Sequence, residues 1–206
     1  MTIECLRARG VSVNSPEPGV WHVEPGPIAG VDIVIEPDLS NAAPFLCAAV
    51  IAGGSVTIPD WPESTTQVGA DLADYLTLFG ATVTRDSRGL TVDGGRGLRG
   101  GTSIPGVTLD LSTGGELAPA LIALAALSDE PSEFRGIAHL RGHETDRLAA
   151  LVAEINGLGG NATELPDGIR LKPSTLHGGE WKTYHDHRMA TAGAIIGLAV
   201  DGVEIE

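Results

Sequence analysis

The amino-acid sequence predicts a mixed α/β (α+β) fold made of repeated βαβαββ units. Three observations support this prediction. Short strand-like apolar runs alternate with stretches of helical spacing, glycines end the helical stretches, and the whole order of segments recurs after about 75 residues. Recurrence at a fixed period is the strongest of the three, because repeat units bury their apolar faces against one another.

The composition is that of a globular protein. The 206 residues are 42% apolar and 19% charged, enough apolar material for a buried core. The formal net charge of −14 argues against a nucleic-acid partner, because phosphate backbones are bound by a basic face. The two cysteines lack metal-ligand spacing, and the N-terminus has no signal-peptide layout. No apolar run reaches the roughly 18 residues of a membrane span. We therefore expect a cytoplasmic protein without a membrane segment.

Residues 1–30 predict the end of a preceding unit followed by a connection. A helical stretch (1–9) precedes two strand-like runs (11–14 and 20–24) around a Pro/Gly turn, and residues 25–30 are rich in breakers. Because the chain begins inside one unit and ends inside another, we expect it to be a piece of a longer protein; the alternative is an independent three-unit protein.

A lobe is predicted over residues 31–206, with units at 31–101 and 102–178 and a partial unit at 179–206. The helix start Asp38-Leu-Ser-Asn41 opens the first unit's first helix. The first unit's expected segments are strand 31–36, helix 42–52, strand 55–59, helix 67–79 and a hairpin of strands 82–85 and 90–92. The second unit's are strand 107–111, helix 116–127, strand 133–139, helix 144–158 and a hairpin of strands 161–164 and 169–171. The partial unit's are strand 181–184, helix 186–198 and strand 203–206.

A run of ionisable residues precedes the last helix start of the second unit, in Arg-Gly-His-Glu-Thr-Asp-Arg-Leu (141–148). Glu144 lies one turn before Leu148 and three residues before Arg147, so the carboxylate and the guanidinium can touch. A helix N-terminus also offers free N–H groups and a partial positive charge. The combination predicts anion binding and proton transfer. The alternative is a solvated first turn with a surface ion pair.

Polar groups recur at the same place in the repeat, where a helix starts after a strand. Glu116 opens the first helix of the second unit, and His187 and Arg188 open the helix of the third, behind Asp186 as N-cap. If the units pack around a common axis, these helix N-termini converge on one site. For Glu116 taken alone, the alternative is a first-turn carboxylate that only the helix dipole favours.

Two other patterns do not predict a cofactor or a metal. The stretch 95–100 matches G-x-G-x-x-G, but a strand rather than a helix is expected after it, so we interpret it as a linker. His185 and His187 lack an evident third ligand.

The charged motifs resemble those of the 5-enolpyruvylshikimate-3-phosphate synthase family. The stretch 141–148 is similar to the family signature R-x-K-E-[ST]-D-R-[LI], and Tyr-His-Asp-His-Arg-Met-Ala (184–190) is similar to its D-H-R-M-A motif. The stretch Asp110-Leu-Ser-Thr-Gly-Gly-Glu116 also fits the family in its spacing from these motifs. The resemblance covers the whole chain but only the C-terminal half of the family's enzyme. It implies one lobe of the enolpyruvyl-transferase fold, an inside-out α/β barrel with three βαβαββ units in each lobe.

The resemblance also implies a reaction and its residues. The family joins phosphoenolpyruvate to the 5-hydroxyl of shikimate 3-phosphate and releases phosphate, without a cofactor. Glu116 would accept the hydroxyl proton, and Glu144 would transfer a proton at the enolpyruvyl carbon. Phosphoenolpyruvate would be bound by Arg147, Arg188 and His187. His143 would lie on the side of the site that faces shikimate 3-phosphate.

This chain departs from the family pattern at two residues and in its extent. His143 stands where many members have Lys, and Glu116 replaces Asp. The other lobe of the family, which carries half of the site, has no counterpart in the chain. We therefore expect a chain that is catalytically incompetent alone. The resemblance also implies a monomeric parent enzyme. The alternatives are a non-catalytic repeat or binding domain, and a UDP-sugar enolpyruvyl transferase, against which the D-H-R-M-A stretch argues.

Overall fold

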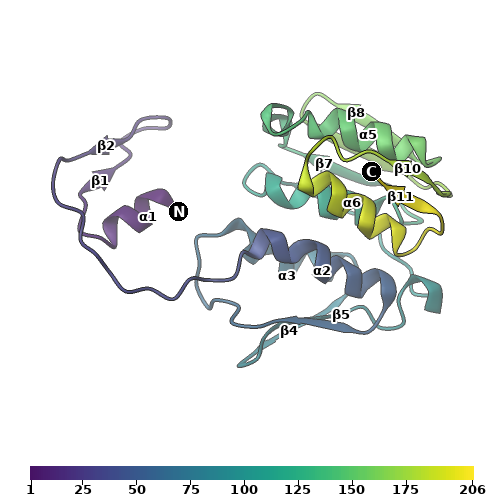
Figure 1. The fold of residues 1–206 in the computed structure, drawn as a ribbon, viewed down its shortest axis with the longest axis horizontal. Helices are drawn as coiled ribbons and strands as arrows, with labels where there is room; N and C mark the ends of the chain where they lie inside the picture. The colour runs from purple at the N-terminus through teal and green to yellow at the C-terminus, as the bar shows by residue number, and fades with distance from the viewer.

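The computed structural model describes residues 1–206 and places the first elements to one side of the rest (Figure 1). Helix α1 (Thr2–Arg7) is followed by the antiparallel pair β1 (Val13–Asn14) and β2 (His22–Val23). A long connection without regular structure then leads to α2. The predicted helix and two short strands of the first 24 residues are thus confirmed, with shorter strands than expected.

The first repeat forms a three-stranded antiparallel sheet covered by helices. The strand order is β3-β5-β4. Its elements are α2 (Leu39–Ala52), β3 (Ser55–Ile58), a 3₁₀ helix (Val68–Asp71), α3 (Leu72–Leu78), β4 (Thr82–Asp86) and β5 (Gly89–Asp93).

The second repeat has all six elements of the βαβαββ order. Its sheet runs β6-β7-β9-β8, with β6 parallel to β7 and the other pairs antiparallel. The elements are β6 (Thr108–Asp110), α4 (Ala118–Ala125), β7 (Ser132–Arg135), α5 (Arg147–Gly157), β8 (Asn161–Leu165) and β9 (Gly168–Lys172). The third repeat adds β10 (Gly179–Trp181), α6 (His187–Gly197) and β11 (Val203–Ile205), with β10 and β11 parallel. The predicted recurrence of elements is confirmed, and the domain boundaries stay a prediction.

Helices α2, α4 and α6, one from each repeat, pack against one another in the interior (Figure 1). Every residue of α4 is buried, which explains its composition of alanine, leucine, isoleucine and one proline. On α6, Gly193 allows a close approach to β10, because a Cβ atom there would lie 2.6 Å from the Trp181 ring. The packing of α2, α4 and α6 against one another brings the starts of these helices together.

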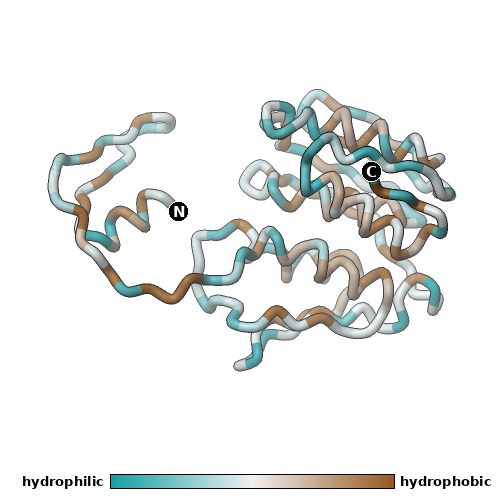
Figure 2. Tube along the Cα trace, viewed as in Figure 1, coloured by the Kyte–Doolittle hydropathy of each residue, from teal (hydrophilic) through white to brown (hydrophobic).

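The strand expected at residues 31–36 is not formed. This stretch is irregular, and Val34 and Ile35 are 96% and 78% exposed. A strand needs a neighbour for its backbone hydrogen bonds, and here the stretch leads away to α1 instead of following the free edge of β3. Figure 2 shows the resulting apolar connection as a brown segment outside the packed body.

Other expected elements differ at their boundaries, among them the strand expected at 181–184, which is β10 at Gly179–Trp181. The helix expected at 67–79 opens as a 3₁₀ helix before α3, and the one expected at 116 begins at Ala118 after a 3₁₀ helix (Gly115–Leu117). The strand expected at 133–139 ends at Arg135, where Gly136 takes a φ of +76° and a 3₁₀ helix (Ala138–Gly142) follows. The longest helix, α2, has 14 residues, and no helix has the length and apolar character needed to span a bilayer.

Candidate active site

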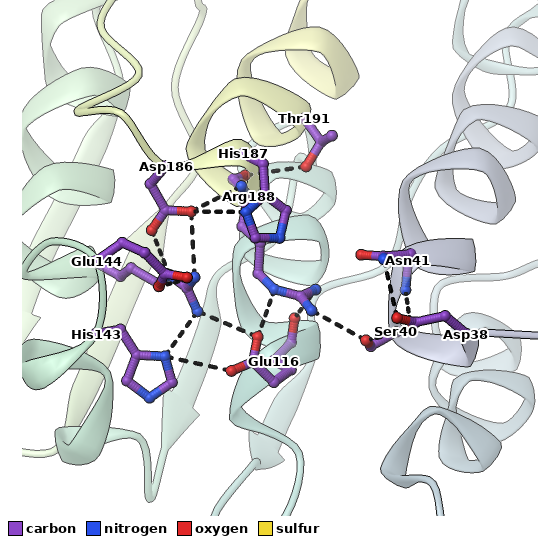
Figure 3. A network of polar contacts seen from close by, with 11 residues as sticks. Asp38, Ser40, Asn41, Glu116, His143, Glu144, Asp186, His187, Arg188 and Thr191 are labelled. Carbon is purple, nitrogen blue, oxygen red and sulfur yellow. Dashed lines mark hydrogen bonds and ion pairs between the residues drawn. The ribbon is translucent and has the colours of Figure 1, made fainter.

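The starts of α2, α4, α5 and α6 meet at one end of the helical layer, where polar side chains gather (Figure 3). Three of these helices have an aspartate N-cap. Asp38 accepts a hydrogen bond from the Asn41 amide at 3.0 Å, and Asp186 accepts one from the Arg188 amide at 2.8 Å. Asp146 caps α5, so this helix begins at Arg147 and not at Glu144 as expected. His143 and Glu144 therefore lie in the loop before α5.

Arg147 is the centre of the cluster, and its side chain is only 1% exposed. Its Nε donates to Asp186 Oδ2 at 2.7 Å, and its Nη2 donates to Asp186 Oδ1 at 3.2 Å and to Glu144 Oε2 at 2.7 Å. Nη1 lies 3.3 Å from Glu116 Oε2 and 3.0 Å from His143 Nδ1. One buried guanidinium thus joins α5 to α6 and to the 3₁₀ turn before α4.

The electrostatics of the buried pair follow from this geometry. Burial acts to raise the pKa of Asp186, but hydrogen bonds from the Arg147 side chain and the Arg188 amide, together with the Arg147 charge, hold it below its usual value. Burial acts to lower the pKa of Arg147, and the hydrogen bonds and charge of Asp186 outweigh it, so this pKa is raised. The pair is therefore fixed in its charged form.

Arg188 links the first, second and third repeats. Its Nη1 donates to the Glu116 carbonyl oxygen at 2.8 Å, and its Nη2 donates to Ser40 Oγ at 3.0 Å. The Nε atom faces Glu116 Oε2 at 2.5 Å as an ion pair rather than as an aligned hydrogen bond. Ser40 stands in the first turn of α2, so Arg188 ties together the starts of α2, α4 and α6.

Glu116 is the carboxylate that these groups share. Besides both guanidiniums it faces His143, whose Nδ1 lies 3.3 Å from Glu116 Oε1; the tautomer decides whether this nitrogen bonds Glu116 or Arg147. The Glu116 and Glu144 side chains are 39% and 49% exposed, in contrast to the buried Arg147. The two guanidinium groups are thus more buried than the two carboxylates that they contact. Buried cations beside accessible carboxylates suit anion binding together with proton exchange.

The structure brings five of the six predicted site residues into direct contact. Glu116, Glu144, Arg147 and Arg188 form ion pairs, and His143 touches two of them. His187 stands at the rim; its side chain is 62% exposed, and its Nδ1 lies 4.0 Å from Asp186 Oδ1. No group of three or more His, Cys, Asp or Glu side chains has a metal-binding arrangement. The catalytic roles of these residues stay predictions.

Sequence reasoning missed two members of the cluster. Asp186 was expected only as an N-cap, yet it is also the buried partner of Arg147. Ser40 was not expected at all, although the helix start of which it is part occupies the same place in the first repeat as Glu116 does in the second. Aligning the helix starts of the three repeats is the signal that points to it.

The fold is that of the enolpyruvyl transferases. The chain matches an EPSP synthase structure from Acinetobacter baumannii with a TM-score of 0.74 at 24% identity, covering 100% of this chain and 49% of that one. It matches the enolpyruvyl transferase NikO from Streptomyces tendae with a TM-score of 0.65 at 19% identity, covering 96% of this chain and 45% of that one. The predicted fold class is confirmed.

The sequence comparisons define the family. The model described as EPSP synthase (3-phosphoshikimate 1-carboxyvinyltransferase) matches residues 1–206, so the chain belongs to the EPSP synthase family. A 3-phosphoshikimate 1-carboxyvinyltransferase from Kocuria rhizophila is 57% identical over 205 residues. That match covers 100% of this chain and 45% of the relative, so the chain spans less than half of the relative's length.

Proposed function

We propose that this chain is one lobe of an enzyme that transfers the enolpyruvyl group of phosphoenolpyruvate to the 5-hydroxyl of shikimate 3-phosphate and releases phosphate. The observation that carries the proposal is the meeting of Arg147, Arg188, Glu116 and Glu144 at converging helix starts in a member of this family. The relative's greater length supports a second lobe that supplies the rest of the site. The chain alone is then catalytically incompetent.

Arg147 and Arg188 bind the phosphate and carboxylate of phosphoenolpyruvate in this proposal, with His187 beside them. Guanidinium groups make bidentate hydrogen bonds to both anions, and the nearby helix N-termini add partial positive charge. Both arginines are paired with the chain's own carboxylates before substrate arrives. Phosphoenolpyruvate therefore displaces Glu116 or Glu144 from the guanidinium groups, while the ion pair between Asp186 and Arg147 remains.

Glu144 and Glu116 divide the proton transfers. Glu144 donates a proton to the methylene carbon of phosphoenolpyruvate, which makes the neighbouring carbon cation-like. The 5-hydroxyl oxygen bonds to that carbon while its proton passes to Glu116. One proton of the new methyl group then returns to Glu144, which re-forms the carbon–carbon double bond, while the carbon–oxygen bond to phosphate breaks and its electron pair leaves with the phosphate. His143, beside Glu116, faces the shikimate-phosphate side.

We also propose boundaries for the lobe, together with the location and oligomeric state of the enzyme. Residues 1–30 end a preceding unit, and the lobe comprises units 31–101 and 102–178 and the partial unit 179–206. The recurrence of the β3-β5-β4 arrangement in β7-β9-β8 supports the division between the two full units. The enzyme acts in the cytoplasm as a monomer, without nucleic acid.

A chimera tests the proposal, with this chain replacing the matching segment of the Kocuria rhizophila relative. We expect it to release phosphate from phosphoenolpyruvate only when shikimate 3-phosphate is present. Glu144→Gln lowers kcat by roughly 10²–10⁴-fold, because it removes a proton-transfer group. Arg170→Met is the matched control, since Arg170 makes only an exposed ion pair with Glu133. A well-folded chimera without turnover, or one unaffected by Glu144→Gln, would favour the non-catalytic binding domain.

A further inference from the structure

The turn that precedes α6 has an unusual backbone. Three non-glycine residues in the chain have positive φ, and two of them are consecutive here, Tyr184 at 56° and His185 at 55°. The left-handed region is unfavourable for residues with a Cβ atom, and such conformations persist only where the surroundings hold them. The next residue is Asp186, the buried partner of Arg147.

A buried carboxylate on α5 holds this turn. The Tyr184 hydroxyl donates to Glu154 Oε1 at 2.6 Å, and the Lys182 amide donates to Glu154 Oε2 at 2.9 Å. Glu154 is buried and has no cationic partner, so these two hydrogen bonds are what satisfies it. The hydrogen bond to Glu154, followed by burial, raises the pKa of Tyr184 to about 12, so the phenol stays a donor at neutral pH.

Helix α5 thus contacts the segment before α6 at two points. Arg147 and Glu154 are separated by seven residues, which places them on the same face of the helix. Arg147 donates a hydrogen bond to Asp186, and Glu154 accepts one from Tyr184, which lies two residues before Asp186. Asp186 in turn accepts a hydrogen bond from the Arg188 amide. The position of Asp186 therefore also decides where α6 begins.

We propose that Glu154 and Tyr184 are positioning residues: their hydrogen bond holds the left-handed turn at Tyr184 and His185 and thereby sets Asp186 against Arg147. The inference rests on the proposed function, because it makes the pair responsible for the geometry of the phosphoenolpyruvate side of the site. Neither side chain makes a hydrogen bond or an ion pair with the arginines or glutamates of the proposed site. Without the hydrogen bond the turn relaxes, Asp186 leaves Arg147, and the start of α6 with Arg188 shifts.

Tyr184→Phe tests the pair, since it removes the hydroxyl and keeps the ring. The matched control is Tyr75→Phe, the other tyrosine of the chain, which is also half-buried and whose hydroxyl makes no hydrogen bond. The readout is amide hydrogen exchange in the 206-residue chain. We expect Tyr184→Phe to speed exchange of the Arg188 and Ala190 amides, both bonded to Asp186, by about tenfold or more, with the β9 amides unchanged.

Two exchange results would overturn the proposal. One is an unchanged Arg188 amide in Tyr184→Phe; the other is an equal acceleration at β9, which would indicate general loss of stability. Glu154→Gln retains one acceptor oxygen and is expected to give a smaller effect at the same amides. Tyr75→Phe is expected to leave both regions unchanged.

Kinetics in the chimera separate positioning from a purely structural role. Tyr184→Phe should raise KM for phosphoenolpyruvate about tenfold and leave KM for shikimate 3-phosphate unchanged, because the proposed function assigns phosphoenolpyruvate, and not shikimate 3-phosphate, to Arg147 and Arg188. An active chimera in which Tyr184→Phe changes neither KM would refute the inference and spare the proposed function. An inactive unsubstituted chimera, with the exchange result intact, would refute the proposed function and spare the hydrogen-bonded turn.

Discussion

The first and second repeats share one scaffold and differ in what is attached to it. The three strands β3-β5-β4 pair in the same order and directions as β7-β9-β8. In the second repeat, β6 adds a fourth strand parallel to β7, with Leu109 buried. In the first repeat, residues 31–36 stand at the corresponding place in the chain but remain exposed.

The helix starts differ as well. The start of α5 carries His143, Glu144 and the buried Arg147, whereas the corresponding helix of the first repeat, α3, begins without a basic residue. The comparison shows that the repeated backbone brings helix starts together, and that a few substitutions at those starts supply the chemistry. The buried ion pair that joins stability to site geometry therefore involves the second repeat, through Arg147, whereas the first repeat adds only the hydrogen bond from Arg188 to Ser40.

Removing Arg147 should have the largest effect on stability. Arg147→Met leaves the buried Asp186 without its cation, and we expect a loss of about 3 kcal/mol or more in the free energy of unfolding in urea. Arg88→Met in the first repeat is the control, because Arg88 pairs with Asp86 at an exposed site, and it should cause no measurable loss. Equal losses of unfolding free energy in the two variants would contradict the proposed difference between the repeats.

The edge strands give the next comparison. Leu109→Ala removes a buried side chain from β6, and we expect a loss of about 2–4 kcal/mol in unfolding free energy. Ile35→Ala alters an exposed side chain at the corresponding place in the first repeat and should change it by less than about 0.5 kcal/mol. A large loss in Ile35→Ala would mean that residues 31–36 pack as a strand in solution.

The acid sensitivity of stability should depend on Asp186. Its pKa is lowered in the folded protein, so below about pH 5 the unfolded state binds more protons than the folded state. Its contribution is complete above the unfolded pKa and is lost as pH falls through the folded pKa. Asp186→Asn should therefore flatten the fall in unfolding free energy between about pH 5 and pH 3.

The control for this pH dependence is Asp32→Asn, in the exposed connection of the first repeat. It should leave the slope of unfolding free energy against pH unchanged. A slope that is the same in Asp186→Asn and in the unsubstituted chain would contradict the assignment of acid sensitivity to the buried pair.

Local sequence signals predicted most of the scaffold. Helical spacing, glycine ends and aspartate caps placed α2, α5 and α6 nearly correctly, because these features act within one or two turns. The error at residues 31–36 has a long-range cause: an apolar run does not reveal whether a neighbouring edge is in reach. The shift of the α5 start to Arg147 reflects capping by Asp146 where Glu144 was expected to open the helix.

The candidate site was predicted by residue type and place in the repeat, but its internal pairing was not. Asp186 lies 39 positions from Arg147 in sequence, and the pair forms only because α5 and α6 pack side by side. The burial of Arg147 follows from that packing. Tyr184 and Glu154 gave no local signal, since positive φ at a tyrosine is not encoded by its neighbours.

Phosphate release from phosphoenolpyruvate and shikimate 3-phosphate tests most directly whether this lobe holds one half of a shared active site. It is measured with the chain alone, and again after adding the part of the Kocuria rhizophila relative that the chain does not match. We expect turnover only in the mixture, lost with Glu144→Gln. Robust turnover by the pure chain would contradict the half-site, as would a mixture whose activity survives Glu144→Gln.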